Sequence, residues 1–283
     1  MIKYLDQLYP FHKCIPVSPD EGSLYKTLAA AKAAANSGEI IVVWPGTYAE
    51  GDLLKNGVNW FFLPGATVAP ASGTSIFSDG GAVITSKIWG FGSFVVAGDA
   101  AVLLLTGGSQ INFECSNISA VTGAPSIAVV RQSAASSVYF TTDQVTVVDG
   151  DGFLISHASA FLYASIRQLS APGGIGLDCN NGTVALTIHS ADNATDIDIS
   201  GGTVKGLILS STSGVVTQTG GTLNLITGTG VFGGAKAYSG AGSPEASQVA
   251  AVGSTYLRTS DESFWMKKTG TGNTGWIEIV AGV

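Results

Sequence analysis

The chain has 283 residues; 45% of them are hydrophobic, only 12% are charged, and the formal net charge is −7. The 13 Lys and Arg residues are scattered along the chain, with only Lys267 and Lys268 adjacent, which argues against a nucleic-acid partner. Gly, Ser, Thr and Asn interrupt every hydrophobic run before it reaches the ~18 residues that a membrane-spanning helix needs, so no membrane partner is expected. The N-terminus carries no continuous apolar segment like that of a secretory signal peptide, so we expect synthesis in the cytoplasm.

The N-terminal segment is the least regular part of the sequence. Residues 1–22 hold several aromatic side chains and three prolines, and they follow no hydrophobic period. Proline fixes its own backbone and donates no hydrogen bond, so it disfavours a regular helix or a central strand. We therefore expect an extended N-terminal arm, which either docks on another protein or lies as a strap across its own domain.

An alanine-rich segment at residues 23–36 predicts a helix, because alanine is the best intrinsic helix former. Ser23 is the expected N-cap, and the nearby Gly38 is the expected stop signal. Within this segment Leu24, Leu28 and Ala31 recur at helical spacing and should face the core.

A buried strand at residues 40–44 follows, and the sequence Pro-Gly-Thr-Tyr at 45–48 then turns the chain. A short alanine-rich helix, a strand and this turn together resemble the start of the pectate-lyase-like right-handed β-helix superfamily. The resemblance implies a parallel β-helix whose helix caps the open N-terminal end. Without a cap, the first coil would expose its apolar interior and unpaired strand edges.

Short strand-like segments fill the chain from residue 52 to residue 235. Between 175 and 227 they recur about every 20 residues, which indicates a solenoid that buries its core by stacking coils. The fold class is therefore predicted as all-β, a right-handed parallel β-helix with an N-terminal capping helix. The candidate strands lie at 59–63, 84–91, 93–97, 101–107, 110–115, 126–130, 138–142, 152–156, 161–166, 175–179, 185–189, 196–200, 207–210, 215–219 and 223–226.

Two of these segments differ in their polarity pattern. In residues 110–115, Ile111, Phe113 and Cys115 alternate with polar residues, which predicts one buried and one exposed face. In residues 101–105 both faces are apolar. An apolar outer face suggests that the solenoid packs against other copies of itself, and we expect a homotrimer.

Glycines accumulate after the last coil, in residues 228–244, and predict a linker. The expected domains are an arm (1–22), the capped β-helix (23–235), and a linker with a small β module (236–283). Strands are expected in the module at 254–259, 263–268 and 275–280. Trp265 and Trp276 should form its core, although tryptophans can also bind sugars.

This C-terminal segment carries the second resemblance. Residues 242–245 read Gly-Ser-Pro-Glu, residues 252–259 read Val-Gly-Ser-Thr-Tyr-Leu-Arg-Thr, and residues 270–276 read Gly-Thr-Gly-Asn-Thr-Gly-Trp. The pattern is similar to a small C-terminal module of bacteriophage tail and other virion proteins. The resemblance implies a component of a phage particle and leaves its position in the particle open.

Three aspartates are the candidate catalytic residues if the protein is an enzyme. Asp196 and Asp198 flank Ile197 and so share one strand face, while Asp178 lies about one coil earlier. Glycoside hydrolases use two carboxyl groups roughly 5–9.5 Å apart, and stacked coils are ~4.8 Å apart. The alternative is that these residues are solvated and make turn hydrogen bonds.

The remaining titratable residues give weaker patterns. Glu114 and Asp143 form a further possible pair whose proximity the sequence does not fix. Residues 149–152, Asp-Gly-Asp-Gly, resemble part of a calcium loop but lack its spacing, so a turn is expected and neither metal nor cofactor is predicted. The cysteines are expected to be buried thiols, and no histidine lies in a nucleophile motif. These residues are Cys14, Cys115, Cys179, His12, His157 and His189.

These observations favour a non-enzymatic structural component of a phage virion, made in the host cytoplasm. We expect a surface-displayed trimer that acts as capsid decoration or cement, or as a short tail fibre. The N-terminal arm would contact other capsid or tail proteins. The alternative is a tailspike that binds or depolymerises host-surface polysaccharide, with Asp178, Asp196 or Asp198 carrying the chemistry.

Overall fold

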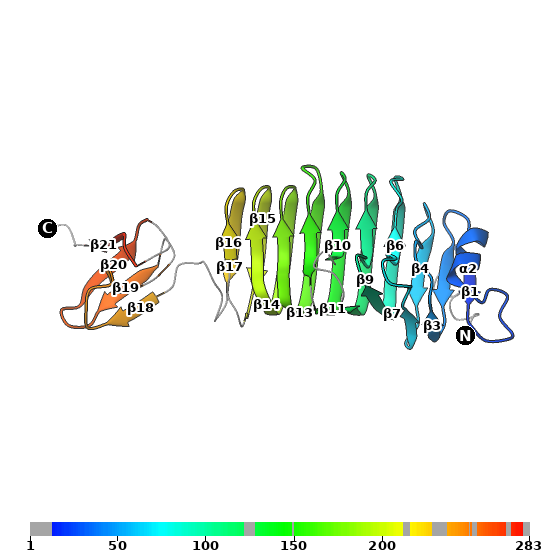
Figure 1. Cartoon of the computed structure of the whole chain (residues 1–283), viewed down its shortest axis with the longest axis horizontal. Helices are drawn as coiled ribbons and strands as arrows, with labels where there is room; N and C mark the ends of the chain where they lie inside the picture. Colours follow the sequence, from blue (N-terminus) through cyan, green and yellow to red (C-terminus); the bar gives the residue numbers. More distant parts are fainter. Residues whose placement is uncertain are drawn as a thin grey trace. The chain divides into compact units, whose positions relative to one another are not determined.

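The computed structural model describes residues 13–121, 128–148, 150–211, 216–227, 237–248, 250, 254–269 and 273–279. The chain divides into two compact units, Met1–Thr229 and Gly230–Val283. The first is a parallel β-helix of about eight turns, whose coils stack side by side in Figure 1. The predicted fold class is confirmed, and the chain shares this architecture with pectate-lyase-like proteins. Most of the N-terminal arm, including His12, lies outside the described residues.

Each full coil contributes strands to three faces, which we number in chain order. Face 1 holds β1 (Cys14–Val17), β2 (Ile40–Val43), β4 (Asn59–Phe62), β15 (Thr203–Ile208), β17 (Thr222–Thr227) and the first parts of β7 (Thr85–Ala97), β9 (Gln110–Val121), β11 (Ser137–Val147), β13 (Phe161–Cys179) and β14 (Thr183–Ile199).

Faces 2 and 3 complete each coil. Face 2 holds β3 (Gly46–Tyr48), β5 (Ala66–Val68) and the following parts of β7, β9, β11, β13 and β14. Face 3 holds β6 (Phe77–Ser78), β8 (Leu103–Leu105), β10 (Ala128–Gln132), β12 (Asp151–Ile155), the ends of β13 and β14, and β16 (Val216–Gln218).

Coil length is not constant along the solenoid. One row of in-register residues on face 1 shows this, and its members are Ile41, Trp60, Ile88, Phe113, Phe140, Ala164, Leu186, Gly206 and Leu225. The sequence interval is longest between Trp60 and Ile88, and it shortens at every step from Phe113 to Leu225. The coil length predicted from the sequence therefore describes only the last coils and the one between β2 and β4.

The interior changes with coil length. In the longer coils, aromatic side chains fill the core and contact one another from coil to coil. Phe113 and Phe140 are stacked with their ring centroids 4.9 Å apart. Beyond Phe153, the buried hydrophobic residues that the structure describes in the solenoid are aliphatic side chains and Cys179. The buried aromatic residues of the solenoid are Tyr48, Trp60, Phe62, Phe77, Phe94, Phe113, Phe140 and Phe153.

The capping helix is shorter than predicted: α2 spans Leu28–Ala34. It starts after Thr27, whose side-chain oxygen accepts a hydrogen bond from the Ala30 amide at 3.2 Å. Ser23 was the wrong cap, because its hydroxyl instead donates to the Tyr25 carbonyl at 2.8 Å. Leu24 precedes the helix and is 82% exposed, so its predicted place in the core is also wrong. Leu28 and Ala31 are buried as expected.

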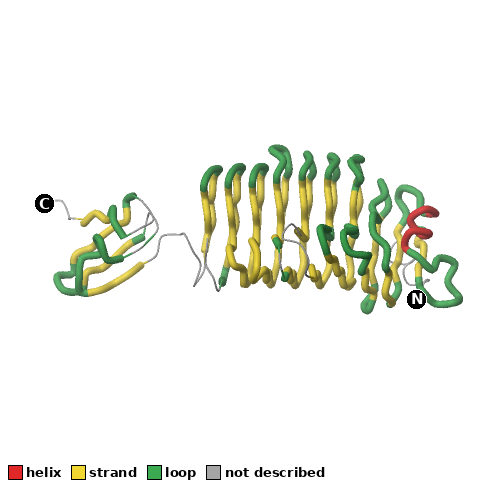
Figure 2. Tube along the Cα trace, in the orientation of Figure 1, coloured by secondary structure: helices red, strands yellow, loops and turns green. Residues whose placement is uncertain are grey.

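A lysine from the next coil holds the other end of the cap. The Lys55 Nζ donates to the carbonyls of Lys32, Ala33 and Ala35, at 2.9, 3.2 and 2.6 Å. The last carbonyls of a helix have no hydrogen-bond partner within the helix. A cation at this end is also attracted by the partial negative charge of the helix dipole. The cap is thereby tied to the solenoid, at the blue end of the chain in Figure 1, where the helix is drawn in red in Figure 2.

The structure accounts differently for the two polarity patterns noted above. In β9 the alternation is confirmed, because Ile111, Phe113 and Cys115 are buried and Glu114 is exposed. In residues 101–105 every side chain except Leu104 is buried within this single chain. That apolar run therefore does not require a second copy, and the trimer stays a prediction.

The C-terminal module is a four-stranded sheet of β18 (Ala237–Gly240), β19 (Thr255–Arg258), β20 (Ser263–Lys267) and β21 (Trp276–Ile279). Strand β18 pairs parallel with β19, and the other pairs are antiparallel. The segment predicted to be a linker therefore contains a strand. The sequence did not indicate β18, because this strand depends on its pairing with β19. The core prediction is confirmed, with Trp276 buried and Trp265 partly buried against it.

Residues of the C-terminal sequence motif hold this module together. Both oxygens of the Glu245 carboxylate accept backbone hydrogen bonds, from Gly275 at 3.1 Å and Trp276 at 2.8 Å. The Asn273 side chain donates to the Ala246 carbonyl at 2.8 Å. Charged acceptors make strong hydrogen bonds to backbone amides. These described motif residues therefore join two distant segments of the module.

Candidate functional site

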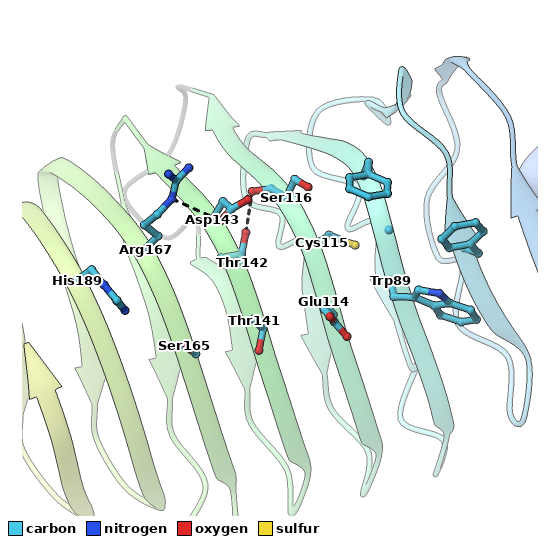
Figure 3. Close-up of a pocket in the computed structure, with 13 residues that line it drawn as sticks. Trp89, Glu114, Cys115, Ser116, Thr141, Thr142, Asp143, Ser165, Arg167 and His189 are labelled. Atoms are coloured by element: carbon cyan, nitrogen blue, oxygen red, sulfur yellow. Dashed lines mark hydrogen bonds and ion pairs between the residues drawn. The ribbon is translucent and has the colours of Figure 1, made fainter.

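A groove of about 530 Å³ runs across the corner between faces 1 and 2. It crosses several coils, so its lining comes from residues far apart in the sequence (Figure 3). Aromatic side chains line one end and charged or polar side chains line the other. The aromatic and titratable side chains of the lining include Phe61, Trp89, Phe91, Glu114, Asp143, Arg167 and His189.

The floor of the groove is a row of outward-pointing residues on face 1. Trp89 is in register with Glu114, then with Thr141 and Ser165 on the next two coils. The Trp89 ring lies 5.5 Å from that of Phe61, and the Lys87 ammonium lies 5.2 Å from the Trp89 ring centroid. A rigid sheet thus holds the rings in fixed positions, as a binding surface requires.

The corner itself depends on a glycine. Gly90 has φ +117°, and a Cβ there would lie 2.2 Å from the carbonyl oxygen of Phe62 in the preceding coil. The strand register shifts between Gly90 and Ser93, where β7 passes from face 1 to face 2. The turn leaves Phe91 largely exposed at the edge of the groove, with 60% of its surface accessible.

The charged groups of the groove are held only loosely. Arg167 Nε lies 3.4 Å from Asp143 Oδ1, and Lys87 Nζ lies 4.0 Å from Glu114 Oε2. All four side chains are exposed, and ion pairs of this kind contribute little to stability. They can exchange partners for the hydroxyl or carboxylate groups of a ligand. Glu114 and Asp143, whose proximity the sequence left open, both line the groove, with Asp143 two residues beyond Thr141, the register partner of Glu114.

The thiols are poorly suited to act as nucleophiles. Burial, followed by the nearby Glu114 charge, raises the pKa of Cys115, so this groove residue stays a neutral thiol. Burial also raises the pKa of Cys179 to about 11, and its thiol donates to the Asn181 carbonyl at 3.3 Å. The prediction that both are buried is confirmed. Cys14 is partly buried against Ile40 and Val42 on face 1.

Two of the three candidate aspartates are neighbours on face 3. Asp178 and Asp198 are in register on adjacent coils, as their sequence spacing predicted. Burial and then the Asp198 charge raise the pKa of Asp178, while a hydrogen bond from Asn180 opposes this shift. Asp196 lies in β14, and its side chain is outside what the structure describes.

A third carboxylate adds to this group. Burial is the main cause that raises the pKa of Asp151, and the charges of Asp178 and Asp198 add to it. The Ile175 amide donates to Asp151 Oδ1 at 3.2 Å, which opposes the shift. None of these three aspartates lines the groove described above. The carboxyl groups best suited to hold a proton and the exposed aromatic rings are therefore in different places.

The weaker motifs do not assemble into a further site. Of the calcium-like sequence, Asp149 lies outside the described residues and Asp151 is the first residue of β12. Within the described ranges, no group of three or more His, Cys, Asp or Glu side chains could hold a metal ion. The His157 ring accepts a hydrogen bond from the Ser159 amide at 3.1 Å, whereas His189 lies exposed at the groove.

Face 1 also carries a second, shallower hollow beyond the groove. Tyr163, Lys205 and Asn224 are among its lining residues, and the Tyr163 ring lies 6.2 Å from that of Tyr139. Sequence reasoning missed this aromatic surface, although each ring occupies an outward position of its strand. The number of residues in each coil determines which outward-facing side chains lie next to each other on adjacent coils. The sequence alone did not give these coil lengths.

No protein-family model, curated protein or solved structure matches this chain. Among the helical residues that the structure describes, no segment is long and apolar enough to cross a membrane.

Proposed function

We propose that this protein is a non-enzymatic, surface-displayed component of a phage particle, and that its groove binds host-surface polysaccharide. The observation that carries the binding proposal is the groove on the corner of faces 1 and 2. There Trp89 and Phe91 supply aromatic surface, and Asp143 with Arg167 supplies hydrogen-bonding groups. An apolar surface with a few converging polar groups is the usual composition of a ligand site.

The separation of groove and protonatable carboxyls favours binding over cleavage. Glycoside hydrolysis needs a carboxyl group that keeps its proton near neutral pH, placed beside the bound sugar. The pKa is raised at Asp151 and Asp178, which lie on face 3, whereas the groove carboxylates Glu114 and Asp143 each face a cation. The carboxyl groups with a raised pKa therefore lie outside the groove that would hold the sugar.

The assignment to a phage particle is supported by the second of the two sequence resemblances. The helix, strand and Pro-Gly-Thr-Tyr turn resemble the start of the pectate-lyase-like β-helix superfamily, which bears on the fold, and the C-terminal motif resembles a virion module. Capsid decoration and a short tail fibre are both compatible with the proposal, as is attachment through the N-terminal arm. A homotrimer would present three grooves, and linked sites raise apparent affinity.

The test is binding of the purified chain to a panel of bacterial surface polysaccharides. We expect binding to at least one of them, and a loss of about tenfold or more in affinity for Trp89→Ala, because this ring supplies much of the aromatic surface at one end of the groove. Leu24→Ala removes an exposed apolar side chain outside the groove and should leave affinity unchanged. Binding to no member of the panel, or equal binding by Trp89→Ala, would contradict the proposal.

A second candidate function, polysaccharide cleavage, is favoured by one observation. Asp178 has a raised pKa and faces Asp198 in register, which is how a general acid and its partner are arranged. If this function is right, incubation with a bound polysaccharide releases reducing ends, and Asp178→Asn and Asp198→Asn each abolish the release. Cleavage that persists in both variants, or its absence from the unaltered chain, argues against face 3 as an active site.

A further inference from the structure

The sheet of the C-terminal module carries an apolar surface on the side opposite its core. Leu257, Phe264, Met266, Ile277 and Ile279 are each 37–44% exposed. Strand pairing aligns Leu257 with Phe264 and Ile279, and Met266 with Ile277. Because residues paired across antiparallel strands point to the same side, these five side chains form one continuous surface, called here the outer apolar face.

The described core of the module is small. Its buried core residues are Ala250, Tyr256 and Trp276, with Tyr238 and Trp265 partly buried against them. The outer apolar face thus exposes more large aliphatic and aromatic side chains than the described core encloses. Small modules without disulfides or metals commonly gain stability by association, and a contiguous exposed apolar surface marks an interaction site.

The charges around this face fit a second copy of the same chain. The five side chains are uncharged, and β20, which carries two of them, is bounded by Glu262 at one end and Lys268 at the other. A two-fold axis through the middle of the face would place Glu262 of one copy near Lys268 of the other. Such an interface uses one patch twice and must be complementary to itself.

We infer that the outer apolar face is an interface between copies of this chain. It does not depend on the polysaccharide-binding proposal, because none of its residues belongs to the groove. Neither does it depend on the apolar run at 101–105, which is buried within one chain. The competing occupants, a surface of the solenoid or another particle protein, predict a monomer for the purified chain.

The first test measures the mass of the full-length chain by light scattering over a range of concentrations. We expect an oligomer, and a dissociation constant raised about tenfold or more by Phe264→Thr, which keeps a good strand former but removes the ring. Val83→Thr, which alters an exposed residue of the solenoid, is the matched control and should associate normally. A monomeric wild-type chain, or unchanged association of Phe264→Thr, overturns the inference.

A charge exchange tests the pairing without removing apolar surface, so it remains informative if Phe264→Thr misfolds. Lys268→Glu should weaken association by a few-fold, and the double variant Glu262→Lys with Lys268→Glu should restore it. Intrinsic fluorescence, to which the buried Trp276 contributes together with the other four tryptophans, checks that each variant is folded. Equal weakening in the single and the double variant overturns the two-fold pairing.

Discussion

The solenoid consists of two regions that share a fold but differ in their interior. From Trp60 to Phe153 the coils are long, and aromatic rings fill the core. From Phe161 to Thr227 the coils shorten, and the buried core that the structure describes there holds no aromatic ring. In the row shared by both regions, Phe113 and Phe140 give way to Ala164, and further on to Gly206. The size of the side chain that each coil contributes to this row therefore goes with the space between the faces of that coil.

The region of long coils from Trp60 to Phe153, called here the wider region, also supplies most of the groove. The region of shorter coils from Phe161 to Thr227 is called the narrower region. The longer coils of the wider region have enough residues to form corners and loops outside the strands, such as the one that exposes Phe91. In the narrower region, nearly all of the described residues of each coil lie in strands or in one tight turn. Here, as in many proteins, loops and corners on a rigid scaffold carry the functional groups. The experiments below test this contrast.

The largest effect is expected for Phe113→Ala, in the wider region. Phe113 is fully buried and its ring lies within 6.1 Å of those of Phe77, Phe94 and Phe140. Its removal leaves a cavity between coils and should lower the free energy of unfolding by about 3–5 kcal/mol. Urea unfolding followed by circular dichroism measures this loss.

The reverse exchange in the narrower region is the natural counterpart. Ala164 is buried and occupies the same row, and Ala164→Phe should overfill the core there, costing about 1–3 kcal/mol. If Ala164→Phe is neutral or stabilising, the narrow coils contain unfilled space, and the contrast between the two regions is wrong.

Gly206→Ala should have the next largest effect, because the coils of the narrower region are in direct contact. A Cβ on Gly206 would lie 1.9 Å from the carbonyl oxygen of Leu186 in the preceding coil. The backbone must move to make room, and we expect a loss of about 2–3 kcal/mol. Gly22→Ala, where a Cβ meets nothing within 4 Å, should leave the unfolding midpoint unchanged. Equal stability of the two variants would contradict the close approach.

Asp79→Asn tests a polar connection in the wider region. Asp79 is buried, and although burial alone would raise its pKa, hydrogen bonds from Thr106, Gly81, Gly107 and Ser109 together lower it. The backbone donors among them lie 2.9–3.1 Å away. Asparagine cannot accept all of these bonds, so we expect a loss of about 2 kcal/mol at pH 7.

The pH dependence of this loss has a defined sign. A carboxylate whose pKa is lowered by folding stabilises the protein above its unfolded pKa of 3.8 and ceases to do so as the pH falls through the folded value. The difference between wild type and Asp79→Asn should therefore shrink when unfolding is measured at decreasing pH below about 4. A difference that stays constant at low pH would show that the charge of Asp79 is not what stabilises this turn.

The smallest effect is expected for Asp178→Asn, and it should be stabilising. The raised pKa of Asp178 means that its charged form is disfavoured in the folded state, so the penalty is full above the folded pKa and is lost as the pH falls to the unfolded value of 3.8. At pH 7 we expect a gain of about 0.5 kcal/mol, which vanishes at acid pH. Glu21→Gln, at an exposed acid, is the control. Destabilisation of Asp178→Asn at pH 7 would assign this carboxylate a structural role.

The sequence predicts strands well and predicts coil lengths poorly. Alternation in β9 identifies its buried side chains, and the pairing of Asp178 with Asp198 follows from coils of nearly equal length. The groove escapes such reasoning, because Trp89, Glu114 and Thr141 meet only through coils of unequal length. The helix was overextended toward its N-terminus because alanine content marks where a helix is possible, while the Thr27 hydrogen bond decides where it begins.

The regular register of the last coils has a consequence for the length of the molecule. Residues 183–188 pair with 161–166 on one side and with 203–208 on the other, in an unbroken register. A duplicated stretch of residues 183–202 would present the same two pairing surfaces as the original. The solenoid would grow by one coil, about 4.8 Å, with its cap, groove and terminal module unchanged. Duplication of a gene segment that encodes one coil is therefore sufficient to lengthen the solenoid, and each duplication adds one whole coil.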